Sequence, residues 1–153
     1  YLKKHLPHLQ GEISATQFKG GHSNLTYAVS AGEDHMVLRR PPFGNKVASA
    51  YDMGREVRVL SKLSPVFPVA PKPLVFCEDE SVMGAPFYVM QKMDGLILRK
   101  DLPAELKGKP EIARAMCEAL IDTLVDLHQV DYQAAGLADL GNPDGYVARQ
   151  VKG

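Results

Sequence analysis

The sequence has no long apolar run, no secretory leader and no excess of either charge. No segment approaches the roughly eighteen apolar residues that a membrane-spanning helix needs, and nothing apolar follows "YLKKHLPHLQ" as a signal peptide would require. Lysine plus arginine number 18, and aspartate plus glutamate also number 18, so the net charge is zero. This balance gives no reason to expect nucleic acid or an anionic membrane as a partner.

Cysteine is scarce, and its placement makes no pattern. Cys77 and Cys117 are the two cysteines, and their spacing fits no metal site. The five histidines form no ligand cluster, so no metal site is predicted within this sequence. A disulfide framework is not expected, and both thiols are predicted to be reduced and buried in a cytoplasmic protein.

The residues that are present suffice for a folded core. The chain of 153 residues is 45% hydrophobic and 24% charged, values typical of a globular domain rather than a disordered chain. The sequence starts at Tyr1 rather than at methionine and stops within "ARQVKG". We expect it to be a piece of a longer polypeptide.

Alternation and periodicity predict an α+β fold, with an antiparallel sheet that carries one helix and then the start of a helical region. Short strands are expected over residues 13–20, 25–31, 35–40, 74–80 and 85–93. Apolar residues at helical spacing predict helices over 45–63 and 110–130, with Pro110 at a first helical position. The tail after residue 130 is expected to be rich in loops. The apolar stripe of the second helix needs a partner surface, and a dimer is one way to provide it.

A pair of glycines precedes the second strand, in "FKGGHSN". Because no side chain intervenes, Gly20 and Gly21 would let backbone N–H groups approach a phosphate, and the Ser23 hydroxyl and Asn24 amide could donate as well. The alternative is an ordinary hairpin turn, in which glycine pairs are common.

The third strand ends in two arginines. Because side chains alternate along a strand, Val37 and Arg39 share one face, while Leu38 and Arg40 share the other. Arg39 could reach a phosphate with its planar guanidinium, and Glu56 in the following helix could hold this cation in place. The alternative is a solvent-exposed strand end beside a solvated helix face. A register shift by one residue would exchange the roles of Arg39 and Arg40.

The segment "FYVMQKMDG" runs from an apolar strand into polar residues and stops at Gly95, as a hinge between two lobes would. The backbone at such a strand end can bond the edge of a planar heterocycle without any special side chain. The alternative is an ordinary strand end.

The glycine turn, strand cation, helix glutamate and strand-to-hinge transition follow one another in the order used by protein kinases. The chain more closely resembles the aminoglycoside phosphotransferase family, and within it the branch with kinase-like domains fused to acyl-CoA dehydrogenases. The matching blocks are "FKGGHSNLTYAV", "VLRRPPFG", "REVRVLSKL", "VMGAPFYVMQKMDG" and "LHQVDYQAAGLADLGNPDGYVARQV". The resemblance implies a protein-kinase-like N-terminal lobe over residues 1–94, then a hinge and the first part of a helical C-terminal lobe over 95–153.

The resemblance also implies which residues bind the nucleotide. The loop residues would cover the phosphates, the arginine would replace the family's lysine on the α- and β-phosphates, and the glutamate would be its partner. Val37 and Met90 would enclose the adenine. Gln91 and Met93 would bond its edge through their backbones. These residues are Gly20, Gly21, Ser23, Asn24, Val37, Arg39, Glu56, Met90, Gln91 and Met93.

The match has two departures and one absence. The loop lacks the three glycines of G-x-G-x-x-G, and arginine stands where the family has lysine. The pattern H-G-D-x-x-x-x-N and the acidic motif after it, which supply the catalytic aspartate and the magnesium ligands, do not occur in the sequence. His128 and Asp131 match a marker that lies before this loop in the family. No catalytic residue is therefore predicted in this chain.

The resemblance implies transfer of the ATP γ-phosphoryl group to a hydroxyl of a small molecule. ATP and Mg²⁺ would be the cofactors, with the metal ligands in a C-terminal lobe that the sequence does not include. By analogy with the fused relatives, the acceptor would be a hydroxylated acyl group or its CoA ester. The alternative is a non-catalytic nucleotide-binding or interaction domain, and the presence of a downstream H-G-D pattern would distinguish the two.

Overall fold

The centre of the structure is one five-stranded antiparallel sheet. The computed structural model describes residues 1–19, 24–42, 52–98, 103–142 and 144–152. The strands lie in the order β1-β2-β3-β5-β4. Their bounds are β1 Ile13–Gln17, β2 Leu25–Ala31, β3 Asp34–Arg40, β4 Pro73–Cys77 and β5 Phe87–Gln91. The predicted α+β class and antiparallel sheet are confirmed.

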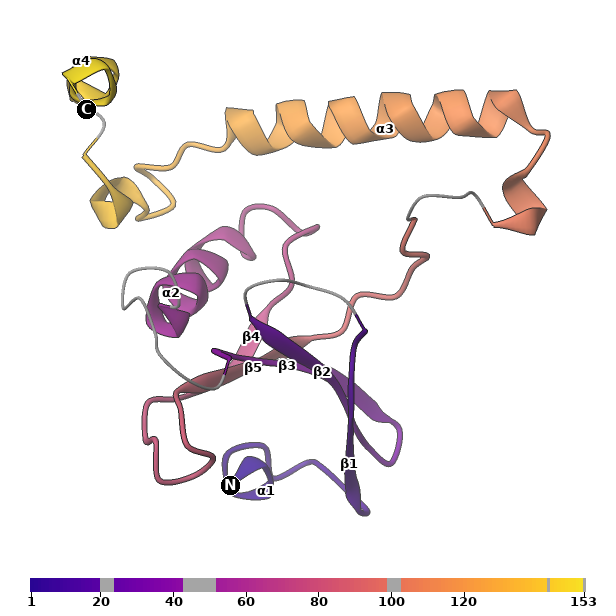
Figure 1. Cartoon of the computed structure of the whole chain (residues 1–153), viewed down its shortest axis with the longest axis vertical. Helices are drawn as coiled ribbons and strands as arrows, with labels where there is room; N and C mark the ends of the chain where they lie inside the picture. Colours follow the sequence, from indigo (N-terminus) through magenta and orange to yellow (C-terminus); the bar gives the residue numbers. More distant parts are fainter. Residues whose placement is uncertain (20–23, 43–51, 99–102, 143, 153) are drawn as a thin grey trace.

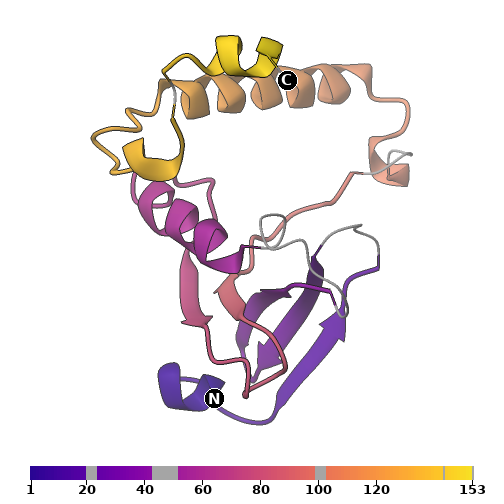
Figure 2. The ribbon, with the colours of Figure 1, turned by 60° about the vertical axis from the view of Figure 1, so that its left-hand side comes forward.

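Helices lie on both sides of this sheet and beyond it. Figure 1 shows α1 below the sheet, α2 above it and α3 well apart from it, and Figure 2 shows the same separation of α3 from the strands. The helices are α1 Leu2–His5, α2 Met53–Leu63, α3 Pro110–Gln129 and α4 Tyr146–Lys152, with 3₁₀ turns η2 Ala104–Leu106 and η3 Ala138–Leu140. Within the described ranges, no helix has the length and apolar character needed to cross a membrane.

One face of the sheet forms the hydrophobic core. Leu6 and Leu9, just after α1, cover this face and are only 8% and 4% exposed. Burial of such side chains is the main favourable contribution to folding. The sheet contributes Val29, Ala31, Met36, Leu38, Val75, Cys77, Phe87 and Val89.

The opposite face of the sheet is the one that carries α2 and the polar residues. Although β4 lies between them in sequence, β3 pairs directly with β5, with Arg39 opposite Tyr88 and Val37 opposite Met90. Residues opposite one another in an antiparallel pair point to the same face. The register therefore places the arginine of β3 beside the strand that leads into the predicted hinge.

Helix α2 begins later than predicted. Asp52 has an extended backbone, with φ −78° and ψ 91°, and its side chain caps the helix by accepting a hydrogen bond from the Arg55 N–H at 2.8 Å. The N–H groups in the first turn of a helix have no carbonyl partner within the helix, and an aspartate at the N-cap position accepts one of them. The helix can therefore begin directly after Asp52. The predicted continuous helix over 45–63 is therefore wrong, because Asp52 is the N-cap and is not helical. Residues 43–51 lie outside the described part of the chain.

The tail also differs from the prediction, because residues Tyr146–Lys152 form helix α4 rather than loop. The segment is "YVARQVK", in which alanine, arginine, glutamine and lysine are all strong helix formers.

Helix α3 begins at Pro110 as predicted, and it contains no buried residue. Its apolar stripe is exposed, with Leu120 68% and Ile121 57% accessible. Cys117 lies on this helix and is exposed, while Cys77 is buried in the sheet, and both are free thiols. The prediction that both thiols are buried is wrong for Cys117, because nothing in the described residues covers this stripe. What covers it in the protein stays a prediction.

Leu9→Ala should lower the stability of the sheet by about 2–5 kcal/mol, because it removes buried carbon atoms and leaves a cavity. Leu74→Ala is the matched control, since Leu74 is 38% exposed on β4, and it should change stability by only about 0.5 kcal/mol. Hydrogen exchange of the β2 and β3 amides measures the opening free energy. Equal effects of the two substitutions would contradict the covering role of residues 6–9.

Candidate functional site

The first turn of helix α2 lies close to strand β4 of the sheet. A Cβ atom at Gly54 would lie 3.5 Å from the ring of Phe76 on β4 and 3.3 Å from Asp52 Oδ1. The distance to Phe76 is an ordinary van der Waals contact, whereas the distance to Asp52 is tight, so glycine at this position leaves room for the Asp52 cap. The approach of the helix to β4 brings Glu56, in the same first turn, over the end of β3 and β5.

The carboxylate of Glu56 receives donors from three separate elements. Asn24, just before β2, donates from Nδ2 to Oε1 at 3.0 Å. Tyr88 on β5 donates its hydroxyl to Oε2 at 2.7 Å. Arg39 on β3 places Nη1 3.5 Å from Oε2. The structure thus brings Arg39 and Glu56 together, and decides against the solvated helix face as the environment of Glu56.

The electrostatics of this cluster favour a fixed carboxylate. Burial, and then the hydrogen bond to Glu56, raise the pKa of Tyr88 above its usual range, so this hydroxyl remains a donor at neutral pH. The side chains of Arg39 and Glu56 are 31% and 32% exposed, and an ion pair with this exposure contributes only modest stability by itself. The short hydrogen bond from a buried tyrosine is the stronger constraint.

The cluster also contains polar atoms that have no partner. Arg39 Nε and Asn24 Oδ1 are both buried. Within the described part of the chain, Arg39 Nε donates no hydrogen bond and Asn24 Oδ1 accepts none. A buried donor left unpaired costs about 1–3 kcal/mol. Since Arg39 Nε carries positive charge, an anionic group brought to this side of the guanidinium would satisfy it.

The choice between the two arginines of β3 is settled by the register. Arg40 is 4% exposed and lies on the other face of the strand from Arg39. It donates to the carbonyl oxygens of Met83 at 2.8 Å and of Pro41 at 3.2 Å. Arg40 thus bonds backbone carbonyls just after β3 and before β5, and Arg39 is the arginine on the Glu56 side.

Arg39, Glu56 and Tyr88 line a hollow of about 290 Å³, and a larger cavity of about 500 Å³ begins at Thr26, the strand partner of Arg39, and extends to the segment after β5. Four residues predicted to contact adenine line it: Val37, Met90, Gln91 and Met93. The walls are mostly apolar, as is typical of pockets for flat heterocycles. The Gln91 N–H already donates to the Lys72 carbonyl at 2.8 Å, so that donor is not available to a ligand.

Three of the predicted loop residues, Gly20, Gly21 and Ser23, lie outside the described part of the chain. Asn24 is described, and its amide is turned toward Glu56. Whether the loop approaches a phosphate stays a prediction. The position of Asn24 links the end of this loop to α2.

Sequence reasoning missed Tyr88 and part of the cavity wall. Phe18, Thr26 and Ile97 line the cavity with the predicted residues. Tyr88 could have been found, because it is two residues before Met90 and strand alternation places both on one face. A hydroxyl in the otherwise apolar run "FYVM" needs a partner when buried, and that need was the available signal.

The outer side of α2 faces the 3₁₀ turn η3, and Figure 2 shows the two lying against each other. Arg58 Nη1 lies 3.5 Å from Asp139 Oδ2, and Arg55 donates to the Leu140 carbonyl at 3.5 Å. Leu137, beside η3, is 9% exposed. Segments about 80 residues apart in sequence therefore hold α2 from the side away from the sheet.

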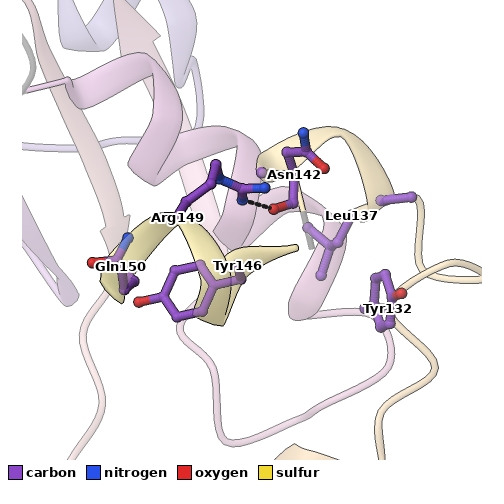
Figure 3. Close-up of a pocket in the computed structure, with 8 residues that line it drawn as sticks. Tyr132, Leu137, Asn142, Tyr146, Arg149 and Gln150 are labelled. Atoms are coloured by element: carbon purple, nitrogen blue, oxygen red, sulfur yellow. Dashed lines mark hydrogen bonds between the residues drawn. The ribbon is translucent and has the colours of Figure 1, made fainter. Parts of the chain in front are cut away.

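A second cavity of about 430 Å³ lies between η3 and α4, away from the predicted residues. In Figure 3 the Arg149 side chain turns toward Asn142, whose carbonyl oxygen accepts its hydrogen bond. The lining residues are Tyr132, Leu137, Ala138, Gly141, Asn142, Tyr146, Arg149 and Gln150. Across the residues that the structure describes, no three histidine, cysteine or acidic side chains gather as metal ligands would.

The sequence and the fold of this chain both match proteins of a known family. The sequence model of the phosphotransferase enzyme family matches residues 14–153. The chain belongs to this family. A family relative of known structure, a protein of Ralstonia eutropha provisionally described as an aminoglycoside phosphotransferase, superposes with a TM-score of 0.78 at 32% identity. That match covers 99% of this chain and 43% of the other.

Family members with similar sequences include acyl-CoA dehydrogenase family member 11. The protein of Gallus gallus is 41% identical over 92% of this chain, and that of Rattus norvegicus is 36% identical over 99%. Acyl-CoA dehydrogenase family member 10 of Mus musculus is 35% identical over 99% of the chain. The chain spans 14–20% of the length of these relatives. The predicted resemblance to phosphotransferases and to domains of acyl-CoA dehydrogenase proteins is confirmed.

Asp52→Ala should destabilise the first turn of α2 by about 1 kcal/mol, because it removes the acceptor for the Arg55 N–H. Hydrogen exchange of the α2 amides should then quicken in the turn that carries Glu56. Asp126→Ala removes the same side chain from the exposed surface of α3 and is the control. Unchanged exchange in Asp52→Ala would mean that the cap does not hold this turn.

Proposed function

We propose that this chain is the nucleotide-binding part of a kinase-like phosphotransferase, which moves the γ-phosphoryl group of ATP to a hydroxyl of a small molecule. The observation that carries the proposal is the Arg39–Glu56 pair, whose arginine is the strand partner of Thr26 in the wall of a mostly apolar cavity. The family to which the chain belongs supports phosphotransfer in general, and the site supports the nucleotide as donor.

The proposed fit to ATP has two parts. The adenine would lie between Val37 and Met90, since both line the cavity from neighbouring strands. Because the Gln91 N–H is engaged, the backbone of Met93 would meet the adenine edge. This removes one group, the Gln91 N–H, from the predicted backbone contacts of Gln91 and Met93 with the adenine edge.

The phosphates would lie beside Arg39. Its unpaired Nε is a buried charged donor, which is the kind of group that an anionic oxygen satisfies. Glu56 would keep the guanidinium turned toward the cavity. Catalysis in this class of reaction comes mainly from positioning and from stabilisation of charge, so these residues would act by holding the donor nucleotide in place.

Magnesium would neutralise charge on the transferred phosphoryl group when bound. The described residues offer no ligand cluster for it, and the H-G-D-x-x-x-x-N pattern is not in the sequence. We therefore propose that the catalytic aspartate and the metal ligands come from a part of the protein that this sequence does not include.

The acceptor follows from analogy with the relatives. Proteins named acyl-CoA dehydrogenase share this domain sequence, so a hydroxylated acyl group or its CoA ester is the acceptor to test first. A panel of such esters, with γ-labelled ATP and the natural full-length protein, measures the transfer directly. Transfer supports the proposal, ATP binding without transfer supports the non-catalytic alternative, and no ATP binding contradicts both.

Arg39→Ala should weaken ATP binding by about tenfold to a hundredfold, the effect expected for loss of charged hydrogen bonds. Isothermal titration calorimetry of the natural full-length protein measures it. Arg58→Ala removes the same charge from the outer side of α2, where its partner is Asp139, and should leave ATP affinity nearly unchanged. If the two variants bind ATP equally well, the assignment of Arg39 to the phosphates is wrong.

Glu56→Gln should lower kcat by about a hundredfold, because a small displacement of the phosphate-binding group misplaces the donor. The melting temperature should change by only a few degrees, since two of the three hydrogen-bond donors can still bond the amide oxygen. Glu33→Gln, in the exposed turn between β2 and β3, controls for the loss of one charge. A fall in melting temperature with kcat retained would make Glu56 a purely structural residue.

A further inference from the structure

Glu56 has more partners than its predicted role requires. An ion pair with Arg39 needs one carboxylate oxygen, yet both oxygens are bonded: Asn24 donates to Oε1 at 3.0 Å and Tyr88 to Oε2 at 2.7 Å. The Arg39 contact, at 3.5 Å to Oε2, is the longest of the three. The position of the carboxylate is therefore set chiefly by the two uncharged donors.

Tyr88 is suited to fix a carboxylate. Its side chain is 1% exposed, on a strand paired on both sides, with Arg39 of β3 and Phe76 of β4 opposite it. A tyrosine ring has few rotatable bonds, so burial leaves the hydroxyl in one place. Because the pKa of Tyr88 is raised by burial and by Glu56, the proton stays on the hydroxyl at neutral pH.

Arg39 is less constrained. About a third of its side chain is exposed, and its long stem can place the guanidinium in several orientations. A mobile cation is oriented by a fixed anion, and not the reverse. Tyr88 and Asn24 therefore fix the position of Glu56, and Glu56 in turn orients Arg39.

We propose that Tyr88 and Asn24 are positioning residues for phosphate binding: together they fix the two carboxylate oxygens of Glu56, and so hold Arg39 toward the nucleotide phosphates. Asn24 adds a second consequence. It is the last residue of the predicted phosphate-covering loop, so its bond to Glu56 joins the loop to α2. This inference rests on the proposed function, because it takes ATP as the ligand of Arg39.

The test compares ATP with adenosine in the natural full-length protein. Tyr88→Phe removes one oxygen atom and should weaken ATP binding by about tenfold, the size of one charged hydrogen bond. Adenosine has no phosphate, so its affinity should not change. Tyr27→Phe is the matched control, since Tyr27 lies opposite Leu38 on the core face of the same sheet, and neither ligand should bind more weakly.

A double-mutant cycle identifies the route of the effect. If Tyr88 acts through Glu56, then Tyr88→Phe should have no further effect on ATP affinity in a Glu56→Ala background. Equal losses for ATP and adenosine, or full additivity with Glu56→Ala, would overturn the proposal. Should Tyr88→Phe not fold, Asn24→Ala must show the same phosphate-selective loss, and its failure to do so overturns the proposal equally.

A further measurement separates this inference from the proposed function. In protein labelled with ¹⁵N-arginine, the Arg39 Nε–H resonance reports the orientation of the guanidinium without any nucleotide. Tyr88→Phe should shift or broaden this resonance, and Tyr27→Phe should not. If the wild-type protein binds no ATP, the proposed function fails by itself. An unshifted resonance in Tyr88→Phe would show instead that Tyr88 does not hold the pair.

Discussion

The Glu56 carboxylate joins the helix of this domain to its sheet. Its three donors come from β3, from β5 and from the residue before β2, so one side chain of α2 connects four segments. If the carboxylate moved, Arg39 would lose its anion and the Tyr88 hydroxyl would be buried without an acceptor. A buried polar group that lacks one of its hydrogen bonds raises the free energy of the folded state. The hydrogen bonds of Glu56 are therefore expected to form or break together.

The rest of the domain keeps α2 in the position that this contact needs. Asp52 caps the helix one turn before Glu56, and Gly54, which faces the Phe76 ring, leaves room for that cap. From the outside, Asp139 and the Leu140 carbonyl engage the two arginines of the same helix. The helix is thus held on both sides, and the outer contacts come from a segment that follows the long helix α3. The side chain of Arg39, although partly exposed to solvent, is paired with a carboxylate that this frame keeps in place.

Much of the fold was predictable because its signals are local. Alternation marked the first two strands, strand-forming runs bounded by turn residues marked the other three, and apolar spacing with Pro110 marked the start of α3. The start of α2 was not predictable from spacing, since the apolar period in the sequence runs on through Asp52, whose own backbone is extended. The exposure of Cys117 was missed for a different reason. Apolar residues at helical spacing indicate a face that can be buried, and they do not tell whether another segment covers it.

The sequence by itself determined the family and the α+β class, because these follow from the order of the motifs and from local strand and helix patterns, and it offered Arg39 or Arg40 as a partner for Glu56. Only the tertiary structure decided which arginine faces the helix, because that choice depends on the register between β2, β3 and β5. Only the structure revealed Tyr88 as a partner of Glu56. The two residues are 32 positions apart, and a hydrogen bond between distant residues depends on strand order and helix placement, which no local pattern encodes.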